Sequence, residues 1–186
     1  MNGPSKNGEH PFGDKGQMVL FALFLIVWIA DSFILHLSAS FTDHIPLYLR
    51  LILSAVLLAL AVYLVKSGHT AVGHEGIPKA VIDTGAFRYV RHPLYLGSVL
   101  FYLSLVVSTA SLLSFALWVV ILVFYDYISC YEERVLEQVF GEEYHSYKSR
   151  TGRWIPRITS ARIDPVESHS YDEEIEKQNR EYTSGA

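Results

Sequence analysis

The sequence contains few of the residues on which disulfide, metal and nucleic-acid chemistry depend. Cys130 is the single cysteine among 186 residues, which excludes an intramolecular disulfide and a multi-cysteine metal site. The 15 lysines and arginines are outnumbered by 19 acidic residues, giving a net charge of −4, and they form no basic run of the kind that binds nucleic acid. We therefore expect no nucleic-acid partner, and we expect Cys130 to be a small packing residue.

Charged residues are also scarce, at 18%, whereas hydrophobic residues make up 51% and the mean hydropathy is +0.24. This composition is too apolar for an ordinary soluble domain. Residues 18–37 and 47–65 are each close to the roughly 20 apolar residues that a helix needs to cross a bilayer. Residues 94–107 and 111–129 form two further apolar stretches. The chain is therefore expected to be an all-α integral membrane protein with four to five transmembrane helices.

The last two apolar stretches predict a helical hairpin over about residues 90–130. The segment S-T-A-S at 108–111 is suited to a tight turn in which a serine or threonine caps the second helix. Apolar residues then recur at helical spacing up to Phe140, and Gly141 is suited to a helix end. This pattern predicts an interfacial amphipathic helix continuous with the fourth span.

Composition also suggests how the chain is divided. Residues 1–17 are polar and rich in glycine and proline, which predicts a flexible arm, and residues 161–186 predict a disordered acidic tail. Residues 18–160 would form one membrane-embedded domain. Of the 15 lysines and arginines, all but Arg50 lie in the arm, the 66–93 loop or the carboxyl region. The positive-inside rule then places both termini and that loop in the cytoplasm.

The loop after the second span is polar. Gly68, Gly73, Gly76 and Pro78 predict that no long helix runs through it. Three histidines lie in or beside the loop, but they lack the spacing of a helical metal site and a carboxylate to complete a ligand set, so no metal is expected. The short apolar run at 79–84 is expected to be extended and to pack over the site.

Basic side chains lie directly beside an apolar stretch at the start of the third span. Arg88, Arg91 and His92 stand where cationic groups are costly in a membrane and tend to mark function, and Pro93 is suited to the first turn of a helix. The two ends of an antiparallel hairpin are neighbours. Arg91 and its neighbours should therefore lie beside the glutamate pair at 132–133. A structural Arg–Glu pairing that only anchors the hairpin is the alternative interpretation.

Four motifs occur in order along the second half of the chain: R-H-P-L-Y-L-G at 91–97, Y-E-E-R-V-L at 131–136, F-G-E-E-Y at 140–144 and R-W-I-P at 153–156. They resemble the isoprenylcysteine carboxyl methyltransferases and the related phospholipid methyltransferases, over roughly residues 81–156. The first motif alone also resembles an ending found in membrane sterol reductases, which use a nicotinamide cofactor. A reductase is therefore an alternative.

The resemblance implies a membrane enzyme that moves a methyl group from S-adenosylmethionine to a lipophilic acceptor. An isoprenylcysteine-like carboxylate is the first candidate acceptor and a phospholipid amine is an alternative. The candidate cofactor-binding residues are Val81, Phe87, His92, Pro93, Leu94, Tyr95, Gly97, Glu132 and Glu133. Arg88, and after it Arg91, is a candidate to hold an acceptor carboxylate, which needs no general base. An amine acceptor would need His92 or a glutamate to remove a proton.

One position departs from the isoprenylcysteine pattern. That pattern places an arginine, which contacts the acceptor, about four residues before the first glutamate. Here the position is Ile128, with Asp126 close by. The departure concerns the acceptor and not the cofactor, so another amphiphile is a second candidate substrate.

Overall fold

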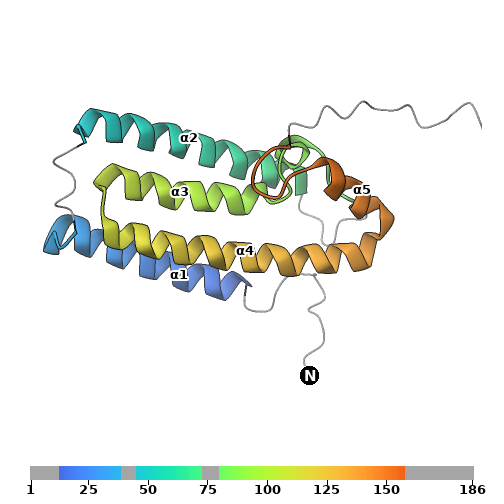
Figure 1. Cartoon of the computed structure of the whole chain (residues 1–186), viewed down its shortest axis with the longest axis horizontal. Helices are drawn as coiled ribbons and strands as arrows, with labels where there is room; N and C mark the ends of the chain where they lie inside the picture. Colours follow the sequence, from blue (N-terminus) through green and yellow to red (C-terminus); the bar gives the residue numbers. More distant parts are fainter. Residues whose placement is uncertain (1–12, 39–44, 73–79, 158–186) are drawn as a thin grey trace, which may run out of the picture.

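Four helices run alternately up and down through the molecule, and a short fifth helix lies at one end (Figure 1). The computed structural model describes residues 13–38, 45–72 and 80–157. The elements are α1 (Gly13–Ile29) with its π-helical extension η1 (Ala30–Leu35), α2 (Leu47–Val72), the 3-10 turn η3 (Gly85–Arg88), α3 (Pro93–Thr109), α4 (Leu112–Phe140) and α5 (Glu142–Arg150). Within these ranges there is no strand, and Val90 and Gly152 form an isolated bridge.

Among the residues that the structure describes, three helical segments are long and apolar enough to cross a membrane: Lys15–Leu35, Leu47–Val72 and Leu112–Phe140. The fourth, α3, is apolar but has 17 residues. Large apolar side chains such as Leu51, Ile52 and Val123 are more than half exposed on these helices, which is expected where lipid, and not water, is the neighbour. The predicted all-α membrane protein is confirmed.

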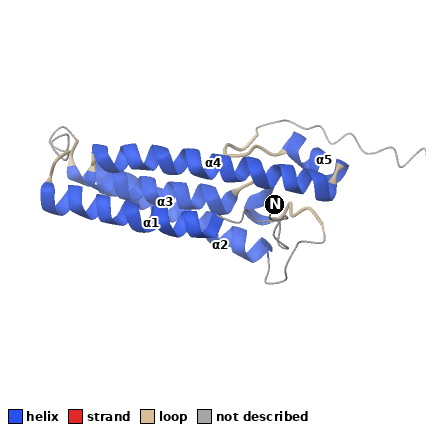
Figure 2. Cartoon of the chain, turned by 90° about the horizontal axis from the view of Figure 1, so that it is seen from below, coloured by secondary structure: helices blue, strands red, loops and turns tan. Residues whose placement is uncertain are grey.

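The core lies between α1, α3 and α4, which are seen side by side in Figure 2. It consists of Phe24, Val99, Tyr102, Val106, Ile121 and Tyr125. The Phe24 and Tyr102 rings meet edge to face with centroids 4.8 Å apart. The Trp28 and Trp118 indoles donate to backbone carbonyls of α3, which orients both rings.

Glycine allows α2 and α3 to pack closely. A Cβ at Gly97 would lie 2.7 Å from Val65 Cγ2 and 3.0 Å from the Ala61 carbonyl oxygen, and one at Gly68 would lie 2.9 Å from Leu94 Cδ2. The prediction that Gly68 helps to break the helix is wrong, because α2 continues to Val72. The usual helical cost of glycine, about 0.5–1 kcal/mol, is offset here by the helix contact it permits.

The predicted hairpin is confirmed. Ala110 ends α3 in the left-handed conformation, and Ser111 caps α4 by accepting from the Ser114 N–H at 3.0 Å. At this turn end of the bundle, the buried Asp31 carboxylate accepts from the Ser38 N–H at 3.1 Å and from the Ser111 hydroxyl. The turn between the two hairpin helices is thereby joined to the end of the first span.

At the opposite end, α4 continues without a break to Phe140, and Gly141 separates it from α5, as predicted. Helix α5 buries Tyr144 and Tyr147. The first helix begins at Gly13, five residues before the predicted start at 18, and a Cβ at Gly16 would lie 2.6 Å from Phe124 Cζ, so a side chain there would require the Phe124 ring to move. The predicted tail at 161–186 and the first 12 residues of the predicted arm lie outside the described residues.

Candidate functional site

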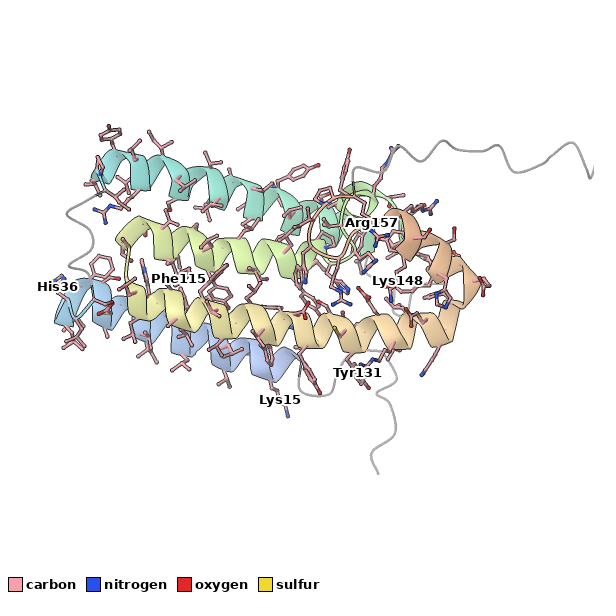
Figure 3. All side chains as sticks on the ribbon, in the orientation of Figure 1. Lys15, His36, Phe115, Tyr131, Lys148 and Arg157 are labelled. Atoms are coloured by element: carbon pink, nitrogen blue, oxygen red, sulfur yellow. The ribbon has the colours of Figure 1, made fainter. Side chains whose placement is uncertain are left out.

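The polar groups gather where α3 begins and α4 ends, close to Lys148 and Arg157 in Figure 3. Pro93 occupies the first turn of α3, where a missing N–H is tolerated. The two residues before it, Arg91 and His92, therefore lie just outside the N-terminus of the helix, a place that we call the mouth of α3. The Arg91 N–H donates to the Gly152 carbonyl at 2.9 Å, which fixes this mouth to the C-terminal segment.

Glu133 is the centre of the cluster. Its side chain is 2% exposed and lies among four basic groups. Arg91 Nε donates to Glu133 Oε1 at 3.0 Å, and Arg153 Nε and Nη2 donate to its two oxygens at 2.9 and 3.1 Å. His92 Nε2 lies 3.3 Å away and Lys148 Nζ 3.5 Å away. A carboxylate this deeply buried requires such pairing, because desolvating an unpaired charge is costly.

Arg91 connects three parts of the chain. Besides Glu133, its guanidinium donates to the carbonyls of Lys148 at 3.1 Å and Thr151 at 2.9 Å. Its side chain is 7% exposed. The Arg–Glu pairing considered from the sequence is therefore present, between Arg91 and Glu133, and it anchors the hairpin to the segment after α5.

Glu132 points in a different direction. The Glu132 side chain is 20% exposed, whereas the Glu133 side chain is 2% exposed. Glu132 accepts a hydrogen bond from the Tyr95 hydroxyl, and one of its oxygens lies 3.8 Å from His92 Nδ1. The His92 and Tyr95 rings are nearly parallel, at 6° with centroids 5.7 Å apart. His92 thus lies between a buried glutamate and an accessible one.

The other predicted residues lie around this cluster. The Val81 N–H donates to Glu143 at 3.1 Å, and the Phe87 carbonyl accepts from the Tyr147 hydroxyl at 2.7 Å. Burial raises the pKa of Tyr147, so its hydroxyl stays protonated and remains a donor. Arg88 ends η3 with an exposed side chain, and it forms no ion pair within the described ranges.

Pro93, Leu94 and Gly97, also predicted to bind the cofactor, lie against α2. Leu94 and Pro93 pack on Gly68, and Gly97 packs on Val65. These three residues therefore set how closely α3 approaches α2. The structure brings together five of the predicted residues, namely Arg91, His92, Tyr95, Glu132 and Glu133.

Two residues of the R-W-I-P motif, Arg153 and Trp154, belong to the cluster but were given no role by the sequence, and the same holds for Lys148. Arg153 Nη1 donates to Asp126 at 3.2 Å and to Cys130 Sγ at 3.0 Å, and Trp154 Nε1 donates to Asp126 at 2.9 Å. The hydrogen bond to Glu133 raises the pKa of Arg153 above its usual value, which keeps it cationic. Ile128, at the departing position, is 1% exposed, and Arg153 is the guanidinium beside this part of α4.

A pocket of about 300 Å³ lies between α1, α2 and α3. It is lined by Phe21, Ala61, Val62, Val65, Lys66, Gly97, Ser98, Phe101 and Tyr102. Its volume is at the lower end of the range for small-molecule sites. Most of its lining is apolar, and Lys66 is its one charged lining residue. Gly97 and Ser98 lie two and three residues after Tyr95 in the chain, but the pocket lining includes none of the polar cluster's residues.

The sequence pattern of the phospholipid methyltransferase family matches residues 49–143, which is just over half of the 186 residues and includes the start of α3 and both glutamates. The chain belongs to this family. The resemblance predicted from the four motifs is confirmed. Among the part of this family member that the structure describes, no three histidine, cysteine, aspartate or glutamate side chains are grouped to hold a metal ion.

A methanethiol S-methyltransferase from Bradyrhizobium diazoefficiens is 38% identical to this family member over 85 residues. The alignment covers 46% of this chain and 29% of the relative. The chain therefore matches less than a third of the length of that relative, and the similarity concerns a shared region and not two whole proteins.

Proposed function

We propose that the protein transfers a methyl group from S-adenosylmethionine to a lipophilic acceptor that enters from the membrane. The observation that carries the proposal is the polar and aromatic cluster at the start of α3, where the partly exposed carboxylate of Glu132 lies beside His92 and Tyr95. A separate apolar pocket between α1, α2 and α3 includes Gly97 and Ser98 of the next turn of α3. Membership of the phospholipid methyltransferase family supports the same reaction class.

The residues present fit the methyl donor. Glu132 keeps enough exposure to accept from ribose hydroxyls or from the ammonium group of S-adenosylmethionine. Tyr95 offers a ring for the adenine. When bound, the donor supplies a methyl group on a positively charged sulfur. The chain then has to align the acceptor with that methyl group and exclude water.

The buried groups hold this arrangement in place. Glu133 keeps Arg91 and His92 at the mouth of α3, and the Tyr95 hydroxyl bond orients Glu132. Val81 and Phe87 lie at the rim, joined to α5 through Glu143 and Tyr147. By holding α3 close to α2, Gly97 shapes the wall of the acceptor pocket.

An isoprenylcysteine-like carboxylate is the first candidate acceptor, because the pocket between α1, α2 and α3 is apolar enough to take a hydrocarbon chain. A carboxylate is already ionised near pH 7, so no general base is needed. Arg88 is the better placed arginine to hold it, because Arg91 already donates to Glu133 and to two carbonyls.

A thiol is the second candidate acceptor. The relative from Bradyrhizobium diazoefficiens is a methanethiol S-methyltransferase. A thiol has an ordinary pKa near 8.5, so its proton has to be removed, and His92 is the group at hand. A phospholipid amine would also have to lose a proton.

The orientation of the protein in the membrane follows the positive-inside rule, with both termini and the site in the cytoplasm.

Calorimetry on the purified full-length protein in detergent tests the proposal. S-adenosylmethionine and S-adenosylhomocysteine should both bind, and NADPH should not. A labelled-methyl assay with prenylated cysteine analogues, alkyl thiols and phosphatidylethanolamine then identifies the acceptor. Arg150→Met is a suitable control, because it breaks only an exposed ion pair with Asp83. No heat with either adenosyl ligand would refute the proposal, and binding of NADPH instead would favour a reductase.

A further inference from the structure

Residues 151–154, which we call the strap, lie across the mouth of α3. The strap is held by backbone bonds: Gly152 O accepts from the Arg91 N–H at 2.9 Å, and Thr151 O accepts from the Arg91 guanidinium at 2.9 Å. Thr151 and Gly152 are buried. A Cβ at Gly152 would lie 1.9 Å from the Ile155 carbonyl oxygen, so the chain requires glycine here. The strap is thus a packed part of the site.

The next two residues of the strap turn their side chains towards α4. Arg153 and Trp154 both donate to Oδ1 of Asp126, at 3.2 and 2.9 Å. Arg153 also reaches both oxygens of Glu133. The hydrogen bond from its indole N–H holds the Trp154 ring in a fixed orientation.

Trp154 is the outermost member of a row of rings. Its centroid lies 6.3 Å from that of His92, the His92 centroid lies 5.7 Å from that of Tyr95, and the Tyr95 centroid lies 5.2 Å from that of Tyr125. The row runs from the strap to the core of the membrane helices. His92 is 7% exposed and Trp154 is half-buried, so the strap supplies the more accessible ring of the two.

We propose that Trp154 contacts the methyl donor and forms the outer wall of its site, with Arg153 as the residue that positions the strap. This inference rests on the proposed function. The sulfur of S-adenosylmethionine is a cation that carries no N–H or O–H, so an aromatic face is a suitable partner for it, and tryptophan is the best of the aromatic residues in this role. The same face attracts the neutral sulfur of S-adenosylhomocysteine less.

The proposal therefore concerns selectivity between donor and product. An aromatic wall at the sulfonium should favour S-adenosylmethionine over S-adenosylhomocysteine, which helps the spent product to leave. If Trp154 only packed against His92, its loss would weaken both ligands to the same extent. The ratio of the two dissociation constants separates a contact residue from a purely structural one.

The test is calorimetry with both ligands on the full-length protein carrying Trp154→Leu or Trp154→Phe. In Trp154→Leu, the dissociation constant for S-adenosylmethionine should rise about tenfold, and that for S-adenosylhomocysteine about threefold or less. Trp154→Phe should lose less. Binding of the donor should change the tryptophan fluorescence of the unaltered protein, and this change should disappear in Trp154→Phe. The protein's other two tryptophans, Trp28 and Trp118, lie in the membrane helices.

Ile155→Ala is the matched control, since Ile155 follows the strap with 79% of its surface exposed, and both dissociation constants should stay unchanged. An equal loss for the two ligands in Trp154→Leu, or a loss below twofold for both, would overturn the inference while leaving the proposed function intact. Failure of the unaltered protein to bind either ligand would remove both. If Trp154→Leu unfolds, Trp154→Met replaces it in the comparison.

Discussion

The buried Arg91–Glu133 pair predicts a large and specific loss of stability when one partner is removed. Consider Glu133→Gln, which conserves shape and removes the charge. Arg153 keeps Asp126 and Lys148 keeps Glu137, at 3.2 and 2.6 Å. Arg91 keeps two carbonyl acceptors but has no other ion-pair partner within the described ranges, and its side chain is 7% exposed.

The expected loss of unfolding free energy in Glu133→Gln depends on which basic groups keep another partner. Removing one partner of a buried pair typically costs about 3–5 kcal/mol, because the other charge is left buried. We expect a loss at the lower end of this range for Glu133→Gln, about 3 kcal/mol. The reason is that Arg91 keeps two bonds to carbonyl oxygens, and Arg153 and Lys148 keep other carboxylate partners. Adding Arg91→Met removes the stranded charge. The double variant should therefore recover about 1–2 kcal/mol relative to the sum of the two single losses.

Denaturant unfolding in detergent micelles, followed by circular dichroism, measures each free energy of unfolding. Arg150→Met is the control, since its pair with Asp83 is about half exposed on both sides and should contribute less than about 1 kcal/mol. The reasoning is refuted if Glu133→Gln loses less than about 1 kcal/mol, or if the two single losses simply add in the double variant.

Three further predictions concern the donor, the acceptor and the backbone. Glu132→Gln should raise the dissociation constant for S-adenosylmethionine about tenfold but lower the free energy of unfolding less than Glu133→Gln does, because Glu132 is 20% exposed and glutamine keeps an oxygen to accept from the Tyr95 hydroxyl; calorimetry and denaturant unfolding check both. Val62→Trp should fill the acceptor pocket and raise KM for long-chain acceptors more than for short thiols, whereas Val120→Trp, on an exposed face of α4, should leave KM unchanged. Gly85→Ala should cost about 1 kcal/mol in denaturant unfolding, because Gly85 has a φ of +58°; no loss would contradict the strain.

The hairpin and its neighbours could be predicted because they follow from local signals. Long apolar stretches, the S-T-A-S segment and Pro93 each mark an element or its end without reference to distant residues. Antiparallel geometry then brings the mouth of α3 beside the glutamate pair, and the hydrogen bonds of Arg91, His92 and Tyr95 confirm this juxtaposition.

Other features depend on contacts between residues far apart in the chain. Glycine favours a helix end, but an isolated glycine is tolerated within a helix, and at Gly68 the missing side chain lets Leu94 pack against α2. The sequence also does not say which glutamate is buried, because adjacent helical residues point about 100° apart and either orientation is compatible with the pattern. Arg153 reaches Glu133 from 20 residues away, across Gly141 and α5, so nothing local indicates the contact.

The carboxylate of Asp31 has a consequence for how the protein is made. Ser38 donates to it from nearby in the chain, but a second hydroxyl partner, Ser111, is synthesised 80 residues later, so the acid enters the bilayer before that partner exists. An aspartate at the centre of a membrane helix costs about 2.5–3.5 kcal/mol during insertion, and Asp31, which lies four residues before the end of the first span at Leu35, should cost less. Arrival of the α3–α4 hairpin therefore relieves part of a penalty carried by the first helix. Retention of the early segment in the membrane becomes coupled to completion of the later one, and replacing Asp31 with leucine should uncouple the two steps in an insertion assay.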